Sequence, residues 1–344
     1  MITYCAKEQS FHLSTKNASY LFAIYQNAYP VHLYWGKRVY GQEALWSLEA
    51  AYRRFERLLS PEPDDDEFTL EYLPQEYPAY GTSDFRPSAY QVRDANGDRI
   101  SDARYIGYEI IEGKPPVPGL PSCYAETGDD VQTLVIRLRD ERLKLTICLY
   151  YSVMSEYDVI ARHTEFRYDG AEPLYLENAL SMSLDNQRGY HEMIQLCGTA
   201  LREKHIEKRP LGNGITQIES LRGVSSHQQS PFCALVNRNT TEHSGDAWGI
   251  SLVYSGNFIL RADADMYKSI RLQVGIHPDT FSWKLSQGDS FHTPEALLAY
   301  SSDGLNGLSQ RLHAIYMQRL ARGLWKNKER PILLNTWEAC YFDF

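Results

Sequence analysis

The chain has 344 residues, of which 43% are apolar, and its 35 Lys and Arg against 44 Asp and Glu give a formal net charge of −9. This composition excludes disordered and collagen-like chains and allows one large or two ordinary domains. The acidic balance, without a block of Lys or Arg, argues against a nucleic-acid surface, because neutralising phosphates requires clustered cations. Residues 1–5 lack the basic start and apolar stretch of a secretion signal, and no apolar run approaches the roughly 18 residues that span a bilayer. We therefore expect a cytoplasmic protein with no nucleic-acid or membrane partner.

The cysteines and histidines give no sign of a metal site. The cysteines lie far apart without a CxxC pair, which favours free thiols in a reducing compartment over a disulfide framework or a zinc site. The histidines show no HxxxH or Cys-paired spacing, so no metal is expected. The six cysteines are Cys5, Cys123, Cys148, Cys197, Cys233 and Cys340.

Two segments in the first third read as loops, and one reads as a hairpin. The acidic run 62–67 (EPDDDE) lacks the ligand spacing and turn glycine of an EF-hand, so a solvated loop is favoured over a calcium site. Asn96-Gly97 suits a type I′ turn and predicts a hairpin between residues 90–93 and 99–100. The proline-rich segment 114–121 cannot be a central strand, because each proline removes a ladder donor. It is expected to be a surface loop.

Alternating apolar residues then predict many antiparallel strands. The pattern runs through residues 134–139, resumes at residues 143–151 after a polar break, and recurs at 248–254 and 270–276. The aromatic content of 12% favours strands and is compatible with stacking on sugar rings. We predict a mainly β fold, a large antiparallel sandwich of two stacked sheets.

The pattern changes near residue 303. Apolar residues recur at helical spacing over 305–320, with Asp303 as a candidate cap and Gly323 as a stop, so a linker helix is predicted. Residues 330–339 then form a proline-started apolar run that suits a strand buried on both faces of a parallel sheet. One parallel strand cannot exist without neighbours, so we expect that a second domain starts here and is cut off at Phe344.

Four motifs, in order along the chain, resemble those of the family 36 glycoside hydrolases, the microbial α-galactosidases. They are residues 76–86 (EYPAYGTSDFR), 221–232 (LRGVSSHQQSPF), 254–258 (YSGNF) and 330–344 (RPILLNTWEACYFDF). The resemblance implies a β-supersandwich domain over residues 1–302, a linker helix over 303–328 and the first strand of a truncated (β/α)8 barrel over 329–344. It also implies retaining hydrolysis of terminal α-1,6-linked galactose from melibiose- and raffinose-type sugars, without a cofactor.

The resemblance assigns one binding residue and no catalytic residue. Trp337 matches the family's tryptophan at the end of the first barrel strand, where it lines the galactose site. A flat aromatic ring stacks on the apolar face of a sugar, although a core position in the barrel is the alternative for Trp337. A barrel needs about 250 residues, and the family's nucleophile and acid/base lie in that missing part. The chain departs from the family at Tyr52, where many members have an acidic residue, and at Ala200, where many have tryptophan.

Other apparent catalytic groups have simpler explanations. Retaining hydrolysis needs two carboxylates about 5–5.5 Å apart, and Glu76 with Asp84, or Glu338 with Asp343, are close in sequence. On a strand, Glu338 and Asp343 would face opposite sides, and Asp84 is better explained by a salt bridge to Arg86. His227 beside two serines suggests a nucleophile and base, but no orienting acid is evident, and a loop histidine is favoured.

The sequence therefore predicts the N-terminal part of an α-galactosidase. This part lacks the catalytic carboxylates and would pack on the barrel, shape the mouth of the substrate site and mediate contacts in a homo-oligomer, by resemblance a tetramer. Galactose-containing oligosaccharides are the expected ligands. A stand-alone carbohydrate-binding or assembly module is the alternative, as is a related specificity such as α-N-acetylgalactosaminidase.

Overall fold

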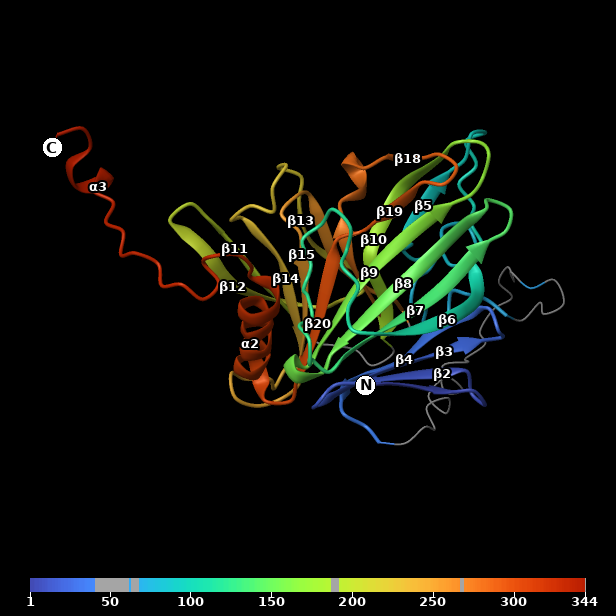
Figure 1. The fold of residues 1–344 in the computed structure, drawn as a ribbon, viewed down its shortest axis with the longest axis horizontal. Helices are drawn as coiled ribbons and strands as arrows, with labels where there is room; N and C mark the ends of the chain where they lie inside the picture. Colours follow the sequence, from blue (N-terminus) through green and yellow to red (C-terminus); the bar gives the residue numbers. More distant parts are fainter. Residues whose placement is uncertain (41–61, 63–67, 187–191, 267–268, 344) are drawn as a thin grey trace.

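The computed structural model describes residues 1–40, 62, 68–186, 192–266 and 269–343, and within them the fold is mainly antiparallel β (Figure 1). A small N-terminal sheet has four strands in sequence order: β1 (Ile2–Cys5), β2 (Ser10–Ser14), β3 (Ala18–Tyr25) and β4 (Tyr29–Lys37). Two larger sheets make up most of the body, so the predicted sandwich is confirmed and the small sheet is an addition to it.

The first large sheet has six described strands. In spatial order they are β13 (Gly214–Ser220), β16 (Phe258–Ala264), β17 (Ile270–Ile276), β10 (Leu174–Asn186) and β18 (Trp283–Leu285), with β5 (Tyr90–Arg93) also paired to β10. The long β10 serves two sets of neighbours: it pairs with β17 from Leu180 onward, and with β18 and β5 before that.

The second large sheet has ten described strands. In spatial order they are β12 (Arg202–Pro210), β11 (Glu192–Thr199), β14 (Gln229–Val236), β15 (Ala247–Val253), β20 (Glu295–Ser301), β9 (Val159–Tyr168), β8 (Leu145–Met154), β7 (Val131–Asp140) and β6 (Arg104–Glu112), with β19 (Ser290–His292) also paired to β9. The predicted hairpin at 134–151 is confirmed as β7 and β8, which pair from Val131 opposite Met154 to Asp140 opposite Leu145.

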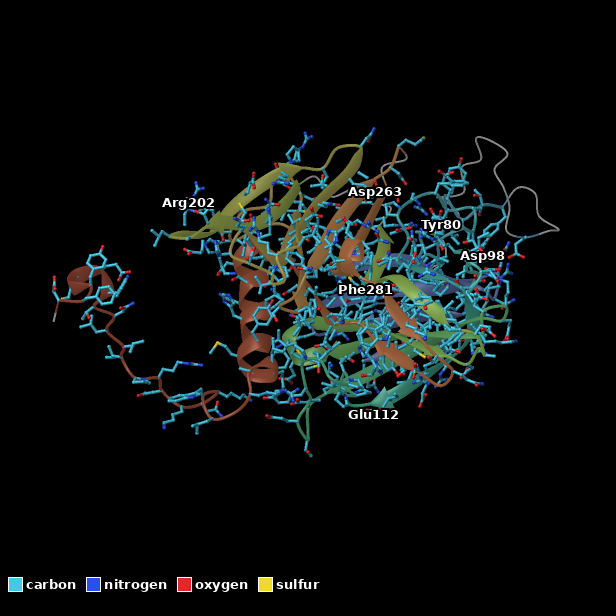
Figure 2. The ribbon with its side chains drawn as sticks, turned by 90° about the horizontal axis from the view of Figure 1, so that it is seen from above. Tyr80, Asp98, Glu112, Arg202, Asp263 and Phe281 are labelled. Atoms are coloured by element: carbon cyan, nitrogen blue, oxygen red, sulfur yellow. The ribbon has the colours of Figure 1, made fainter. Side chains whose placement is uncertain are left out.

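One continuous hydrophobic core joins the three sheets. It contains side chains from β7 and β8, such as Leu134 and Leu145, and side chains from β10 and β17, such as Leu184 and Leu272. These residues are the inward members of alternating strands, which is why the period-two pattern was visible in the sequence. Figure 2 shows the same body from above, with its side chains drawn.

The predicted hairpin at Asn96-Gly97 is wrong. The turn forms, with Gly97 at φ +90°, but β5 pairs with β10 and the residues after the turn form no strand. The side chain of Asp94 accepts the backbone N–H groups of Asn96 and Asp98, and the side chain of Asp98 accepts that of Ile100. These donors are therefore not available to a strand ladder.

The proline-rich segment 114–121 forms a loop, as predicted, but its first residue points inward. The Lys114 Nζ lies 2.5 Å from Glu295 on β20, and both side chains are buried. The other Glu295 oxygen accepts the backbone N–H of Cys123 at 2.7 Å. A paired buried charge is costly to separate, so this ion pair fixes the loop to the ten-stranded sheet.

The predicted linker helix is present as α2 (Gly304–Ile315), which continues as one wider turn, Tyr316–Leu320. Its apolar stripe, Leu308, Leu312 and Ile315, packs in a second hydrophobic cluster against β15 and β20. Asp303 stands at the N-cap position but makes no capping hydrogen bond; it pairs with Arg311 at 3.3 Å instead. The helix therefore belongs to the sandwich, and the chain leaves the body after it.

The predicted strand over residues 330–339 is not formed. Ile332, Leu333 and Leu334 are 103%, 88% and 82% exposed, and the segment ends in a single helical turn, α3 (Trp337–Cys340). The backbone of a parallel strand needs neighbouring strands as hydrogen-bond partners, and the segment projects away from the described body (Figure 1). Figures 1 and 2 both place it at the end of the molecule where the β11–β12 hairpin lies.

Candidate functional site

Trp337, the residue expected to bind sugar, is the first residue of α3 and is 46% exposed. Its ring packs edge-on against Tyr341 and Phe342, with centroid distances of 5.6 and 5.0 Å. Glu338 and Asp343, the carboxylates considered beside it, are both exposed, and they lie on and just after a helical turn. The strand geometry assumed for that pair therefore does not apply.

The 76–86 motif contributes two buried carboxylates with separate partners. Glu76 accepts hydrogen bonds from Tyr20 and Tyr151 at 2.7 and 2.8 Å, and it lies 2.7 Å from the His32 ring and 3.2 Å from the Arg162 guanidinium. Burial opposes the charge, but Arg162 and these hydrogen bonds outweigh it and hold the pKa of Glu76 below its ordinary value. Glu76 is thus an ionised structural centre of the core rather than half of a catalytic pair.

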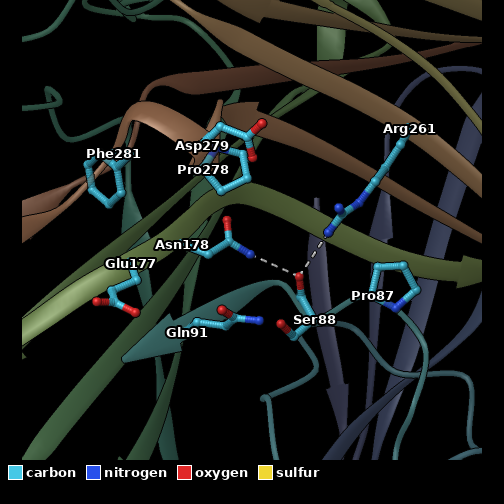
Figure 3. A pocket seen from close by; sticks show the side chains of 9 residues that line it. All are labelled: Pro87, Ser88, Gln91, Glu177, Asn178, Arg261, Pro278, Asp279 and Phe281. Atoms are coloured by element: carbon cyan, nitrogen blue, oxygen red, sulfur yellow. Dashed lines mark hydrogen bonds between the residues drawn. The ribbon is translucent and has the colours of Figure 1, made fainter. Parts of the chain in front are cut away.

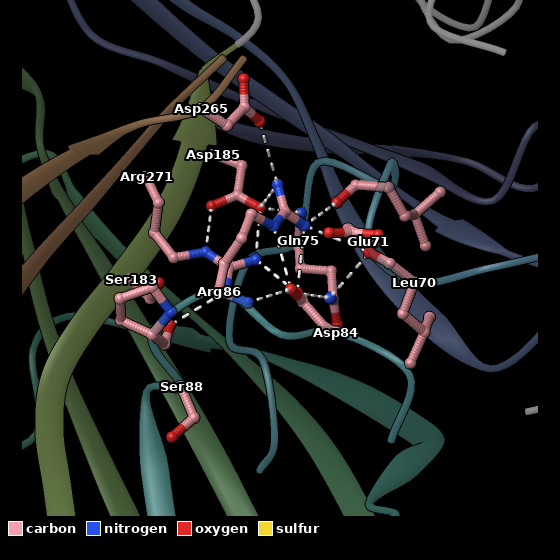
Figure 4. Close-up of polar contacts among 12 residues, drawn as sticks. Leu70, Glu71, Gln75, Asp84, Arg86, Ser88, Ser183, Asp185, Asp265 and Arg271 are labelled. Atoms are coloured by element: carbon pink, nitrogen blue, oxygen red, sulfur yellow. Dashed lines mark hydrogen bonds and ion pairs between the residues drawn. The ribbon is translucent and has the colours of Figure 1, made fainter. Parts of the chain in front are cut away.

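Asp84 belongs to a second buried network, shown in Figure 4. The predicted salt bridge is confirmed, with Arg86 Nε 2.9 Å from Asp84 Oδ1. Arg271 on β17 joins it, donating to Asp84 at 2.6 Å and to Asp185 on β10 at 2.7 Å, and Arg86 lies 3.2 Å from Asp185. Burial opposes ionisation, but the two guanidinium groups hold the pKa of Asp84 below its ordinary value. Asp265 Oδ2 also lies 3.9 Å from Arg86 Nη1, so three carboxylates surround the two guanidinium groups.

This network fixes the loop that follows the motif. The Pro87 carbonyl accepts hydrogen bonds from Arg271 Nη1 and Gln273 Nε2, at 2.9 and 3.0 Å. The next carbonyl, that of Ser88, accepts from Asn178 Nδ2 and Arg261 Nη2, at 3.1 and 3.2 Å. The loop is therefore held by side chains from three neighbouring strands of the six-stranded sheet.

A pocket of about 410 Å³ opens over this loop (Figure 3). It lies where β10 changes its pairing partners, and it is lined by Pro87, Ser88, Gln91, Glu177, Asn178, Arg261, Pro278, Asp279 and Phe281. No pattern in the sequence indicates this pocket. Its lining comes from four separate segments, and the pairing shift in β10 that brings them together leaves no periodic signal.

The second and third motifs of the sequence lie against each other. The Gly223 N–H donates to Asn257 Oδ1 at 2.6 Å, and the Ser225 N–H donates to the Ser255 carbonyl at 2.8 Å. His227 is exposed in the neighbouring turn and takes part in none of the hydrogen bonds among the described residues. Among the described residues, His227 therefore has no acid or nucleophile that would support a catalytic role. The two motifs together stabilise a turn between the large sheets.

Ala200 lies with Leu201 at the tip of the β11–β12 hairpin, where Thr199 pairs with Arg202. Leu201 is fully exposed, with φ +69°. A second pocket of about 560 Å³ lies beside this tip, lined by Cys197, Gly198, Thr199, Arg202, His205, Ile206, Glu207, Gln228 and Gln229. Tyr52, the other position that departs from the family, and the acidic residues 63–67 lie outside the described residues.

The cysteines are free thiols. In the described part of the chain, no group of three His, Cys, Asp or Glu side chains could hold a metal ion. Among the described helices, none has the length and apolar character to cross a membrane.

Comparison with known proteins gives the family. Residues 28–286 match the glycosyl hydrolase family 36 N-terminal domain, and residues 290–344 match the melibiase family. The chain is 45% identical, over its whole length, to α-galactosidase AgaA of Geobacillus stearothermophilus, and it covers 47% of that protein. The chain belongs to glycoside hydrolase family 36, and it corresponds to the N-terminal region of the family's α-galactosidases.

Solved structures agree with this assignment. The crystal structure of α-galactosidase AgaB from G. stearothermophilus superposes with a TM-score of 0.94 at 44% identity, over all of this chain and 47% of that one. A variant of AgaA in complex with raffinose superposes with a TM-score of 0.91 at 44% identity, over 97% of this chain and 46% of that one. The chain thus spans about half the length of the relatives it matches.

Proposed function

We propose that this chain is the N-terminal portion of a cytoplasmic α-galactosidase that removes terminal α-1,6-linked galactose from melibiose- and raffinose-type sugars with retention of configuration. In this proposal residues 1–302 are the supersandwich domain, 303–328 the linker and 329–344 the start of the catalytic barrel. The observation that carries the proposal is the match of the whole chain to the N-terminal half of α-galactosidases, one of which is seen with raffinose.

The exposed end of the chain supports the barrel assignment. Three consecutive large apolar side chains, Ile332, Leu333 and Leu334, are almost fully exposed. Such a run is unusual on a free surface and indicates a segment that is buried in a larger assembly. As the first barrel strand, it would bury all three and carry Trp337 to the strand's carboxyl end, where barrel enzymes build their sites. There the Trp337 ring would stack on galactose.

The catalytic carboxylates are proposed to lie outside these 344 residues. The buried candidates support this view, because Glu76 and Asp84 are each neutralised by arginines inside the core and face different partners. The chain's own residues would pack on the barrel and shape the substrate mouth. The β11–β12 hairpin, with Ala200 at its tip, lies at the same end of the molecule as Trp337 and is the proposed contributor to that mouth and to contacts in a homo-oligomer.

The test supplies the missing domain. Residues 1–344 are joined to the remaining C-terminal half of AgaA, and release of galactose from raffinose is measured. The proposal expects the joined protein to hydrolyse raffinose. A stand-alone binding module would gain no activity from the fusion, even when the joined protein is folded and monodisperse.

A further inference from the structure

The pocket over Ser88 is built where the six-stranded sheet divides. The pairing of β10 with β5 shifts register between Leu176 and Asn178, and its pairing with β17 shifts between Leu180 and Met182. Such bulges turn side chains out of their regular alternation and are common beside functional sites. Glu177 and Asn178, which lie at the first of these shifts, both line one cavity. Its volume of about 410 Å³ lies in the range of small-molecule sites, about 300–1,000 Å³.

The polar groups of the pocket are held in place before any ligand arrives. Asn178 is 4% exposed, and its Nδ2 is fixed on the Ser88 carbonyl. Arg261 is fixed by the same carbonyl and by Gln273, whose side-chain oxygen accepts from Arg261 Nε at 2.6 Å. Groups with fixed positions lose little entropy on binding.

One of these groups lacks a partner. The buried Asn178 Oδ1 accepts no hydrogen bond from the described residues, and Figure 3 shows it directed toward Pro278, away from the Ser88 carbonyl. Arg261 has five N–H donors in its guanidinium group, and its bonds to Ser88 and Gln273 use two of them. The pocket therefore presents an acceptor next to a donor group, which is the arrangement that a hydroxyl group needs.

The charges favour a neutral ligand. Glu177 is already paired with Arg93 at 2.6 Å and with Arg99 at 3.0 Å. The remaining lining charges are the Arg261 guanidinium and the exposed carboxylate of Asp279, which are of opposite sign. The lining therefore has no excess of positive or negative charge that would select an anion or a cation.

An aromatic surface continues from the lip of the pocket. Phe281 lines the pocket, and Trp283, two residues further on, is 50% exposed. Both rings pack against Phe291, with centroid distances of 5.4 and 5.2 Å. Aromatic rings provide apolar faces for the C–H side of a sugar, while amides, carboxylates and guanidinium groups bind its hydroxyls.

We propose that this pocket is a saccharide-binding site that takes one hexose unit of an oligosaccharide, with Asn178 and Arg261 binding its hydroxyl groups and Phe281 lying against its apolar side. Asp279 accepts a hydrogen bond from a hydroxyl at the open edge, and Trp283 is positioned for a second sugar unit. The inference goes beyond the proposed hydrolase activity and does not depend on it, since binding here involves no bond cleavage.

Titration of raffinose into the full chain, followed by calorimetry or by saturation-transfer NMR, tests the site. Galactose and sucrose, titrated separately, identify which unit is bound. Asn178→Leu and Phe281→Ala are each expected to weaken binding about tenfold, because each removes a contact with the buried part of the sugar. Asp279→Asn, at an exposed position that leaves the fold intact, is expected to weaken binding severalfold.

Two controls make the result specific. Asp130→Asn changes another exposed carboxylate, far from the pocket in sequence, and should leave affinity unchanged. Melting temperatures verify that each variant is folded. Trp325→Ala, which removes a 42% exposed tryptophan of the linker, should also leave this binding unchanged. The inference is overturned if none of the three sugars binds saturably, or if folded Asn178→Leu, Phe281→Ala and Asp279→Asn proteins bind as the wild type does.

Discussion

Trp337 is the residue of this chain that the proposed function places against galactose. In the structure its ring packs against Tyr341 and Phe342 in a small aromatic cluster. The cluster lies at the end of a segment whose apolar side chains are exposed. A core position would require it to be buried by the barrel, whereas a binding position would leave one face open to substrate. The two alternatives predict different kinetics.

In the protein completed with the AgaA barrel, Trp337→Ala should reduce kcat/KM for an α-galactoside by about three- to tenfold, the equivalent of one aromatic stacking contact. Trp325→Ala is the matched control, since Trp325 is 42% exposed in the linker. It should leave kcat/KM unchanged. Unaltered kinetics in Trp337→Ala, with lowered stability, would place Trp337 in the barrel core.

Buried titratable groups set the pH dependence of stability. His163 is buried and stacks on Tyr150 at 4.3 Å. Burial, assisted by the charges of Lys114 and His292, lowers the pKa of His163 well below its ordinary value. In the unfolded chain the His163 ring takes up a proton near pH 6.5. In the folded chain the same ring stays neutral at that pH. Stability is therefore complete above pH 6.5 and falls as the pH is lowered below it.

The variant His163→Phe keeps the ring and removes the titration. Below pH 6.5 the wild type should lose about 1.4 kcal/mol more per pH unit than the variant, measured by urea unfolding between pH 5 and pH 8. Above pH 7.5 the stability difference between the two should no longer change with pH. Parallel pH profiles below pH 6.5 would show that His163 is protonated in the folded protein.

At the residue level, the sequence allowed some partners to be predicted and not others. The Asp84–Arg86 pair was accessible because the two residues are neighbours in one turn. Arg271 and Asp185, which complete that network, come from strands far along the chain, and nothing local marks them. Asn178 and Arg261 were missed for the same reason.

Among the elements, β10 is the one that organises the six-stranded sheet. It exchanges β5 and β18 for β17 near Leu180, where Gly275 on β17 passes very close to its backbone. A Cβ atom at Gly275 would lie 2.6 Å from Leu180 Cα and 2.7 Å from the Ser181 nitrogen. Backbone atoms cannot move aside as a flexible side chain can, so glycine is required there.

Gly275→Ala should therefore lower the free energy of unfolding by about 1–3 kcal/mol, the usual cost of overpacking. Gly212→Ala is the matched control, because a Cβ there meets no atom within 4 Å, and it should change stability by less than about 0.5 kcal/mol. Chemical denaturation of both variants measures the difference. Equal stabilities would mean that β10 and β17 separate at little cost.

Elements were predicted well where their signal was local and strongly periodic. The β7–β8 hairpin and α2 each bury one face, so their apolar residues recur at a regular spacing that can be recognised in the sequence. The strand expected after Asn96-Gly97 failed because the side chains of Asp94 and Asp98 take its backbone donors. The strand expected at residues 330–339 failed for a different reason: its apolar pattern is real, but its hydrogen-bond partners are not among the described residues.

At the scale of the whole molecule, the described sandwich is distinct from the larger enzyme to which it is proposed to belong. The sandwich has a continuous core, and α2 ends it. Beyond α2 the chain exposes Ile332, Leu333 and Leu334. The family and fold follow from the matches along the whole chain, whereas the hydrolysis of galactosides by the longer enzyme is a proposal.

The most direct measurement compares nitrophenol release from a nitrophenyl α-galactoside by the 344-residue chain alone and by the same chain joined to the C-terminal half of AgaA. We expect no turnover by the chain alone and clear turnover by the joined protein, because the proposed function places the catalytic carboxylate pair in the C-terminal half. Turnover by the chain alone, or a folded joined protein without activity, would contradict it.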